Sequence, residues 1–306
     1  MDVKVSIIII NYNTYELTKK CIESVFTKTI ATPFEIILID NASTECKPEI
    51  FLELFPDIQL AKSRQNVGFA GGNNLGISKA NGEYILLLNS DTELLNDAVT
   101  EAIAVFEQEA DIGVLSGQLL SPDGSIQAQA GRFPSIMREI RELFRLNKLL
   151  SPKQRAHYYL GTECDYNVPI DADWVWGAFF LFRKSDLEFF PDKKLHETFF
   201  MYGEDMQWCY HFKKILNKRI VVHPAPKILH HVGASDKSSL KGFQRYKEKM
   251  LPNEARWLAI TKGRIYARVF YLVKSLLYFS MKRNEENKQK AATYLSFACR
   301  ALDKQK

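Results

Sequence analysis

Short apolar runs alternate with helix-patterned segments over about the first 90 residues, and this alternation restricts the fold more than any other feature of the chain. Continuous β-branched runs that are too short for a helix are typical of strands buried in a parallel sheet. The expected strands are Val3–Ile10, Phe34–Ile39, Ile58–Lys62 and Tyr84–Leu88, and the expected helices are Tyr15–Phe26, Pro48–Phe55 and Gly71–Ala80. Strands that alternate with helices predict right-handed βαβ units, and therefore an α/β fold with a mostly parallel sheet.

The rest of the chain departs from this rhythm. Its patterns predict helices at Asp97–Glu109 and Glu204–Leu216 and strands at Ile112–Leu120, Asp173–Phe182, Ile220–His223 and Lys227–His231. Residues 121–167 have no clear pattern and contain a basic stretch, Met137–Arg145. We expect one α/β domain over residues 1–235, with halves of about 1–120 and 121–235, and a basic helical extension over residues 236–306.

The expected extension differs from the expected domain in charge. The whole chain has 41 Lys and Arg against 36 Asp and Glu, a net charge of +5. Residues 236–306 contain 17 basic and six acidic side chains, whereas residues 1–235 contain 24 and 30. This asymmetry indicates an anionic surface as a partner of the extension.

Composition excludes several classes of protein. Hydrophobic residues make up 46% of the chain and charged residues 25%, which is the mix of a globular protein and not of a disordered, collagen-like or multi-span membrane protein. The five cysteines are scattered without a CxxC pair, which argues for a reducing compartment and against a disulfide scaffold or a zinc site. The N-terminus lacks the pattern of a signal peptide, so we expect a cytoplasmic protein.

Polar segments follow the apolar runs directly, and in a parallel sheet such strand ends lie along one edge. Ligands of open α/β sheets bind at this edge. The four segments are Asn11-Tyr12-Asn13, Asp40-Asn41-Ala42-Ser43, Asn66–Asn74 and Asn89-Ser90-Asp91. Solvated loops are the simpler explanation of one such segment, but four in a row indicate a binding crevice.

Asp91 places a carboxylate at the end of a predicted buried strand, two residues after the amide of Asn89. Mg²⁺ and Mn²⁺ take oxygen ligands and retain waters, so one or two carboxylates suffice to hold them beside a diphosphate. Capping of a following helix is the alternative role for Asp91. The glycine-rich segment Gly68–Asn74 is able to bring backbone N–H groups to a phosphate or sugar, but it is neither a dinucleotide-binding fingerprint nor a P-loop.

Two further polar pairs lie in the second half of the chain. Glu204-Asp205 opens a predicted helix after an aromatic segment, where a carboxylate could deprotonate a hydroxyl, although helix capping is the simpler reading. His230-His231 ends a predicted strand and suits a cation such as Mn²⁺, although a structural histidine pair is the more common case.

Seven of these segments, taken in order along the chain, resemble the family 2 glycosyltransferases, and within them the rhamnosyltransferase-like branch that builds bacterial surface polysaccharides. The likeness runs from about residue 4 to about residue 260. The matching segments are Val5–Asn13, Ile39–Ser43, Asn66–Asn74, Leu87–Thr92, Trp174–Ala178, Phe200–Asp205 and His230-x-x-Gly233-x-Ser235.

The resemblance implies a GT-A fold, which is a Rossmann-like, mostly parallel central sheet flanked by helices. Its N-terminal half would bind a nucleotide-diphosphate sugar and its C-terminal half an acceptor. The residues that it implies for donor and acceptor binding are Asn11, Asp40, Asn41, Asn66, Gly68, Asn89, Trp176 and Gly177.

The resemblance also implies the reacting groups. Asp91 and His230 would hold Mn²⁺ or Mg²⁺, with His231 as the other candidate. Asp205 would be the general base of an inverting displacement, and Glu204 its neighbour and acceptor contact. The donor would be dTDP-rhamnose or a UDP-sugar, and the acceptor a saccharide or a lipid-linked saccharide.

Two departures from the family pattern leave a second reading open. Asn89 stands at the first position of the DxD-type motif, and Trp176 stands where relatives usually carry a small residue. The alternative function is a nucleotide-sugar or saccharide-binding module that has lost turnover, and donor hydrolysis with Mn²⁺ would discriminate between the two readings.

Residues Arg264–Arg283 alternate basic side chains with aromatic and aliphatic ones. The residues predicted to share one helical stripe are Arg264, Arg268, Ser275 and Lys282, with Tyr271 and Tyr278 beside them. The segment falls short of the ~20 apolar residues that a membrane span needs, so we expect a helix in the interface of an anionic membrane at the inner face of the cytoplasmic membrane. A helix packed on the domain or on a second subunit of a homodimer is the alternative, and nucleic acid is not expected as a partner.

Overall fold

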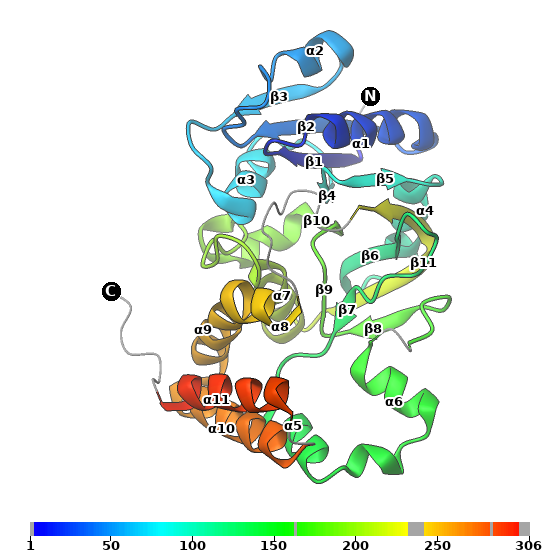
Figure 1. Cartoon of the computed structure of the whole chain (residues 1–306). Helices are drawn as coiled ribbons and strands as arrows, with labels where there is room; N and C mark the ends of the chain where they lie inside the picture. Colours follow the sequence, from blue (N-terminus) through cyan, green and yellow to red (C-terminus); the bar gives the residue numbers. More distant parts are fainter. Residues whose placement is uncertain (1–2, 162–163, 232–241, 282–283, 300–306) are drawn as a thin grey trace. The chain divides into compact units, whose positions relative to one another are not determined.

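The apolar runs form neighbouring strands of one large sheet in the computed structural model (Figure 1). The structure describes residues 3–161, 164–231, 242–281 and 284–299. The strands are β1 (Val5–Asn11), β2 (Phe34–Asp40), β3 (Gln59–Lys62), β4 (Tyr84–Asn89), β5 (Thr92–Leu94), β6 (Ile112–Leu120), β7 (Ala130–Gly131), β8 (Ile170–Ala172), β9 (Trp174–Val175), β10 (Phe179–Arg183) and β11 (Arg219–His230).

Helices connect and follow these strands. They are α1 (Tyr15–Lys28), α2 (Ile50–Leu54), α3 (Gly68–Ile77), α4 (Ala98–Gln108), α5 (Ile136–Leu143), α6 (Pro152–Tyr159), α7 (Glu204–Tyr210), α8 (Gly242–Arg245), α9 (Leu251–Lys262), α10 (Arg264–Ser280) and α11 (Glu285–Cys299). A π-helical turn, His211–Ile215, continues α7 directly.

The direction of the strands confirms the predicted α/β fold with a mostly parallel sheet. The order in the nine-stranded sheet is β3-β2-β1-β4-β10-β6-β11-β5, with β8 also paired to β11. The first four strands are parallel to one another. Because β10 is antiparallel to both β4 and β6, and β11 is parallel to β6, six of the nine strands point the same way.

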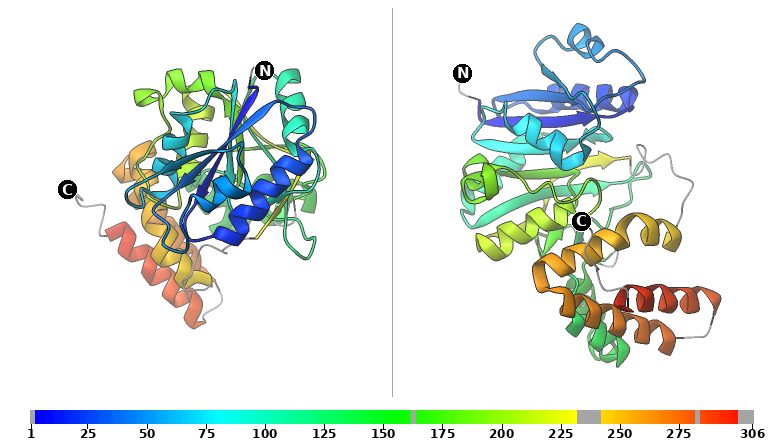
Figure 2. Two further views of the ribbon diagram at one scale, coloured as in Figure 1. Left: turned by 90° about the horizontal axis from the view of Figure 1, so that it is seen from above. Right: turned by 90° about the vertical axis from the view of Figure 1, so that its left-hand side faces the viewer.

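Strand alternation assigns the two faces of the sheet to different helices (Figures 1 and 2). Alternate residues of β1 and β4, such as Ile7, Ile9 and Leu86, are buried in one cluster with apolar side chains of α1 and α4. Their neighbours face the other way, where Ile8 and Ile10 lie against glycines of α3. Helices therefore cover both faces, as a mostly parallel sheet requires.

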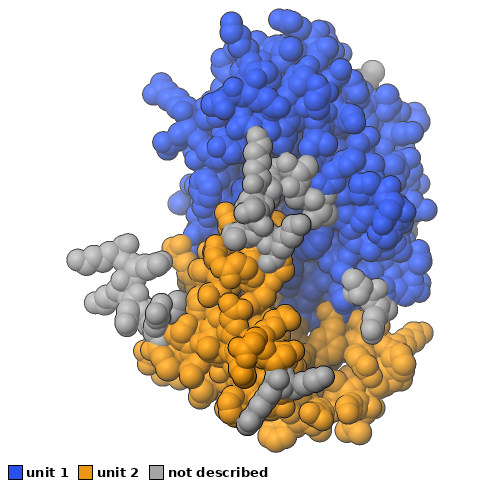
Figure 3. Space-filling model, in the orientation of Figure 1, with its two compact units in different colours: residues 1–132, 160–237 blue, residues 133–159, 238–306 orange. Residues whose placement is uncertain are grey.

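The described residues form two compact units (Figure 3). Unit 1 comprises residues 1–132 and 160–237 and contains all the strands. Unit 2 comprises residues 133–159 and 238–306 and is helical. The basic stretch Met137–Arg145, for which the sequence has no clear pattern, forms most of α5 in unit 2, where α10 packs against α5, α9 and α11.

Three predicted elements differ from the structure. Helix α3 begins at Gly68 and not at Gly71, and its glycines Gly72 and Gly76 let it lie close to Ile10 and Ile8 of β1. The strand predicted at Asp173–Phe182 is broken into β9 and β10. The two strands predicted after residue 219 are one strand, β11, with a register shift between Val222 and Lys227.

The stripe predicted on the extension is exposed only in part, at Arg264 and Arg268. Tyr271 and Ser275 are buried inside unit 2, and Lys282 lies outside the described residues. The face of α10 that carries Tyr271 and Ser275 packs against α11 and α5, so a different face of the helix is exposed to solvent. No helix among the described residues is long and apolar enough to cross a membrane.

Candidate active site

The ends of β1 and β2 meet through their polar side chains. Asn11 Nδ2 donates to Asp40 Oδ1 at 3.2 Å, and Asn11 Oδ1 accepts hydrogen bonds from the hydroxyls of Thr14 and Thr18 at 3.1 Å each. Asp40 Oδ2 accepts the backbone N–H of Ser43 at 3.2 Å. Asn11 and Asp40 are both buried, so this part of the sheet edge is a fixed hydrogen-bonded corner.

A second group of predicted site residues joins the end of β2 to the start of α3. Asn41 Nδ2 donates to Asn66 Oδ1 at 3.0 Å, and Asn41 Oδ1 accepts the N–H of Val67 at 3.0 Å. Gly68 has a φ of +76°, and a Cβ added there would lie 2.4 Å from the carbonyl oxygen of Phe200. Only glycine allows this approach of α3 to the loop before α7.

The end of β4 lies next to the same corner. The Thr14 and Ser90 hydroxyls are 3.1 Å apart, and Thr14 also bonds Asn11, so the first and fourth strand ends are connected. The backbone N–H of Asn89 donates to the carbonyl of Ala178 at 3.0 Å. Asp91 follows directly and is buried.

Asp91 faces His230, which stands at the end of β11. Because β11 pairs with β5, His230 Nε2 lies 3.5 Å from Asp91 Oδ1. His231 contacts a different carboxylate, since its Nε2 lies 2.8 Å from Glu93 Oε1. Gly233 and Ser235, the other members of the predicted histidine motif, lie outside the described residues.

Gln127 fixes the orientation of the His230 ring. Its Nε2 donates to the His230 carbonyl at 2.8 Å, so its Oε1 is left to accept the proton of His230 Nδ1 at 2.9 Å. The Nε2 atom of a neutral His230 then presents a lone pair to Asp91. Gln127 is not predictable from the sequence, because a single glutamine in a segment without periodicity carries no signal of its own.

The Nε2 lone pair of His230 and the carboxylate oxygen of Asp91 face one another, and two such acceptors can share a cation. Two acceptors at 3.5 Å repel unless a proton or a metal ion lies between them. No cluster of three His, Cys, Asp or Glu side chains that could hold a metal occurs among the described residues. Mg²⁺ and Mn²⁺ take their remaining ligands from water and phosphate oxygens, so two protein ligands fit a cation shared with a diphosphate.

Trp176 and Gly177 connect this pair with the predicted base. The Trp176 ring stands edge-on to the His230 ring, with centroids 6.1 Å apart. A Cβ added at Gly177 would lie 2.9 Å from the Phe69 ring and 3.9 Å from Asp205 Cβ. One dipeptide, at the break between β9 and β10, thus touches the two chemically distinct parts of the site.

The carboxylates of Glu204 and Asp205 lie at the first turn of α7. Asp205 Oδ1 accepts the N–H of Met206 at 2.7 Å, and the N–H of Gly177 also bonds this carboxylate. Burial raises the pKa of Asp205 above its usual range. Burial, together with the charge of Asp205, raises the pKa of Glu204 as well, and Glu204 Oε2 has no hydrogen-bond partner among the described residues.

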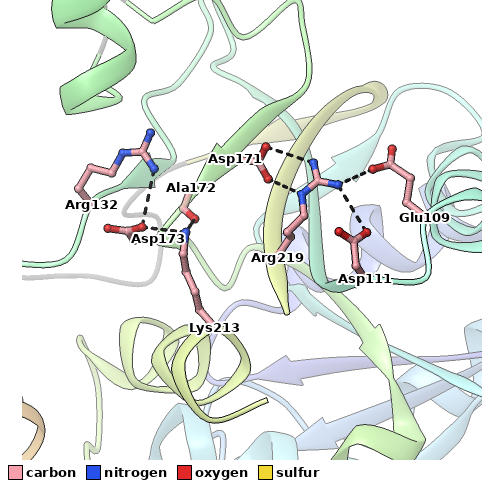
Figure 4. A network of polar contacts seen from close by, with 8 residues as sticks. All are labelled: Glu109, Asp111, Arg132, Asp171, Ala172, Asp173, Lys213 and Arg219. Carbon is pink, nitrogen blue, oxygen red and sulfur yellow. Dashed lines mark hydrogen bonds and ion pairs between the residues drawn. The ribbon is translucent and has the colours of Figure 1, made fainter. Parts of the chain in front are cut away.

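An ion-pair cluster ties the π-helical turn after α7 to the end of β8 and to Asp173, which follows it (Figure 4). Lys213, in the π-helical turn after α7, donates to the Ala172 carbonyl and lies 2.8 Å from Asp173. Arg132 lies 3.7 Å from the same carboxylate. A neighbouring cluster joins Arg219 with Glu109, Asp111 and Asp171. The contacts of Lys213 thus hold the end of β8 and Asp173 against the turn that follows α7.

All the predicted site residues therefore lie along one chain of contacts at the carboxyl edge of the sheet. Comparison with known proteins identifies the family of the chain. The family model described as "Glycosyl transferase family 2" matches residues 6–189. The O-antigen biosynthesis protein RfbC of Myxococcus xanthus is 30% identical over 128 residues, which are 40% of this chain and 10% of that protein.

Two other similarities extend over more of the chain. The low-salt glycan biosynthesis hexosyltransferase Agl10 of Haloferax volcanii is 27% identical over 218 residues, 68% of this chain and 61% of that protein. A crystal structure of GalNAc-T7 with UDP, GalNAc and Mn²⁺ matches with a TM-score of 0.58 at 13% identity, over 95% of this chain and 55% of that one. The chain thus spans less than two thirds of each of these proteins, and the structural match shows a shared GT-A fold.

Proposed function

The chain belongs to glycosyl transferase family 2, and on this premise we propose that it is an inverting, metal-dependent glycosyltransferase. Its donor would be dTDP-rhamnose or a UDP-sugar, and its acceptor a hydroxyl of a saccharide or of a lipid-linked saccharide. Similar proteins are named for O-antigen and glycan biosynthesis, and one similar fold was crystallised with UDP and Mn²⁺, which supports a nucleotide-sugar donor and a role in polysaccharide synthesis.

One observation carries this proposal. A single dipeptide, Trp176-Gly177, lies against His230 at one end and against Asp205 at the other. A cation-binding pair and a carboxylate base are the two groups that transfer from a nucleotide-diphosphate sugar requires, one for the leaving diphosphate and one for the attacking hydroxyl. A binding module without turnover needs no base with a raised pKa at this place.

In this mechanism Asp205 accepts the proton of the acceptor hydroxyl as the oxygen attacks the anomeric carbon. The bond to the diphosphate breaks in the same step, so the anomeric configuration inverts. The raised pKa of Asp205 makes it a stronger base than an ordinary aspartate, and the N–H of Gly177 orients it. Glu204 contacts the acceptor, and its raised pKa favours a protonated carboxyl that donates a hydrogen bond.

Asp91 and His230 would hold Mn²⁺ or Mg²⁺ together with the donor diphosphate. The bound ion would neutralise the charge that develops on the leaving group. Gln127 keeps His230 Nε2 turned toward this position.

The hydrogen-bonded corner at the ends of β1 and β2 would bind the nucleotide. Asp40, Asn41 and Asn66 line it, and Gly68 brings the start of α3 close. We place the donor half at about residues 1–120, the acceptor half at about residues 121–235 and a helical extension at residues 236–306.

The test is a panel of dTDP-, UDP- and GDP-sugars, assayed for donor hydrolysis and for stabilisation against heat, with and without Mn²⁺. We expect one nucleotide sugar to stabilise the protein by about 2–3 kcal/mol at 100 times its Kd. The same nucleotide sugar should be hydrolysed to sugar and nucleoside diphosphate only with metal present. Asp205→Asn should lower turnover by about 10²- to 10⁴-fold and keep nucleotide binding, whereas Asp57→Asn, at an exposed turn, should change neither. Binding without hydrolysis in the wild type would favour the module that has lost turnover.

A further inference from the structure

Helix α10 presents a row of large apolar side chains to solvent. Their spacing of four and three residues places them on one face of the helix. The five side chains are Ile265 (78% exposed), Val269 (40%), Leu272 (44%), Leu276 (48%) and Phe279 (70%). We call these five residues the α10 stripe.

The α10 stripe is not the face that packs the helix into unit 2. That face is formed by other side chains, among them Phe270, Tyr271 and Leu277, which are buried against the neighbouring helices. Unit 2 also contains 12 of the 24 large apolar side chains that are exposed among the described residues, although it is the smaller unit. A contiguous exposed apolar row on a helix that is already packed marks a surface for a partner.

Charge on α10 selects the kind of partner. The helix has no Asp or Glu, and Arg264 and Arg268 are exposed at its first turns beside the stripe. Lys274, on the packed side, lies 3.6 Å from Glu254 and above the ring of Phe270, so it belongs to the interior of unit 2. An exposed apolar row with exposed arginines at its margin matches the headgroup and acyl boundary of an anionic bilayer.

We infer that the α10 stripe docks unit 2 onto the surface of a bilayer that contains anionic phospholipid. The helix lies in the plane of the interface: its other side is held by α5 and α11, so only the stripe enters the acyl region. Arg264 and Arg268 remain at the level of the lipid phosphates. A lipid-linked saccharide is found at such a surface, so docking there favours this acceptor over a free saccharide. This choice of acceptor rests on the proposed function.

The test is flotation of the full chain with vesicles of equal parts phosphatidylglycerol and phosphatidylcholine, and with vesicles of phosphatidylcholine alone. We expect binding to the anionic vesicles that weakens at high salt, and weak binding to the neutral ones. Leu272→Glu combined with Leu276→Glu should lower the bound fraction about tenfold or more, because a carboxylate would enter the acyl boundary. Both positions are exposed, so we expect the variant to fold, and circular dichroism checks this.

The matched control is Ile30→Glu combined with Val168→Glu, which changes two exposed apolar side chains of unit 1 to the same residue. This variant should float like the wild type. Arg264→Gln combined with Arg268→Gln should reduce the preference for anionic vesicles and keep the weak binding to neutral ones. Equal flotation of the stripe variant and the wild type would overturn the inference.

A second copy of the chain on the stripe is the competing outcome. Light scattering without vesicles would then show a wild-type dimer that the stripe variant converts to monomer, and flotation would be absent, which overturns membrane docking. The failure of the proposed function is separable. Asp205→Asn should float like the wild type, and the stripe variant should keep donor hydrolysis in solution.

Discussion

The strand ends of β1 and β2 and the polar groups beside Trp176-Gly177 lie in one site, but their polar atoms are satisfied in different ways. Both side-chain polar atoms of Asn11 and of Asn41 have hydrogen-bond partners within the protein. In contrast, Glu204 Oε2 has no partner among the described residues, and His230 presents Nε2 to a carboxylate. The hydrogen bonds at the ends of β1 and β2 therefore stabilise the fold, whereas the groups beside Trp176-Gly177 retain polar atoms that are able to bind a ligand.

This difference predicts that substitutions in the two regions change different quantities. Removing a group from the paired region should cost stability, because its partners are left buried without hydrogen bonds. Removing a group from the unpaired region should cost activity, and the fold should gain or keep stability, since a desolvated charge is relieved.

The largest effect is expected for Asp205→Asn. The amide cannot accept a proton from the acceptor, so kcat should fall about 10²- to 10⁴-fold, the usual contribution of a general base. The unfolding temperature should not fall. Rates of sugar transfer at saturating donor and metal measure this, with Asp57→Asn as the control. A loss of less than about tenfold would remove Asp205 from the role of base.

A smaller effect on activity is expected for Gln127→Met, which keeps the length of the side chain but removes the acceptor for His230 Nδ1. Losing a group that orients a metal ligand typically weakens metal binding about 10- to 100-fold. The Mn²⁺ concentration for half-maximal rate should rise by that factor, with less change in kcat at saturating metal. Gln65→Met, at an exposed position, is the control, and an unchanged Mn²⁺ requirement would show that the ring needs no such orientation.

The paired region should respond in stability. Asn11→Ala leaves buried hydrogen-bonding groups of Thr14, Thr18 and Asp40 without their partner, so the free energy of unfolding should fall by about 2–3 kcal/mol. Chemical denaturation measures this, with Gln65→Ala as the exposed control. A variant as stable as the wild type would mean that Asn11 is held for a ligand and not for the fold.

The sequence is informative about the first region because its signals are local. Each strand is a continuous apolar run with a polar residue at its end, so the ends of β1, β2 and β4 could be located and placed on one edge from the parallel topology. Helix α3 was predicted to begin three residues too late, since glycine disfavours a helix by propensity and Gly68, which has a positive φ, begins this one.

The second region depends on contacts between distant residues, which spacing does not encode. Gln127 and His230 are 103 positions apart, and no sequence pattern around Gln127 predicts its contact with His230. The same holds for α10. A helical wheel shows which residues share a face of the helix, but it does not show which face the neighbouring helices cover. The family resemblance supplied the roles of Asp91 and Asp205, and the structure supplies their surroundings.

The last effect concerns the pH dependence of stability, which changes gradually over several pH units. The folded-state pKa of Glu204 is raised, so the folded protein holds this proton more tightly than the unfolded chain. The free energy of unfolding should therefore fall as the pH rises from the ordinary value of 4.5 to the raised one, by about 1.4 kcal/mol per pH unit. Glu204→Gln removes this titration and should flatten the pH profile, becoming more stable relative to the wild type at higher pH. Asp57→Asn should follow the wild-type curve, and parallel curves for Glu204→Gln and the wild type would show that this carboxyl is solvated in the folded state.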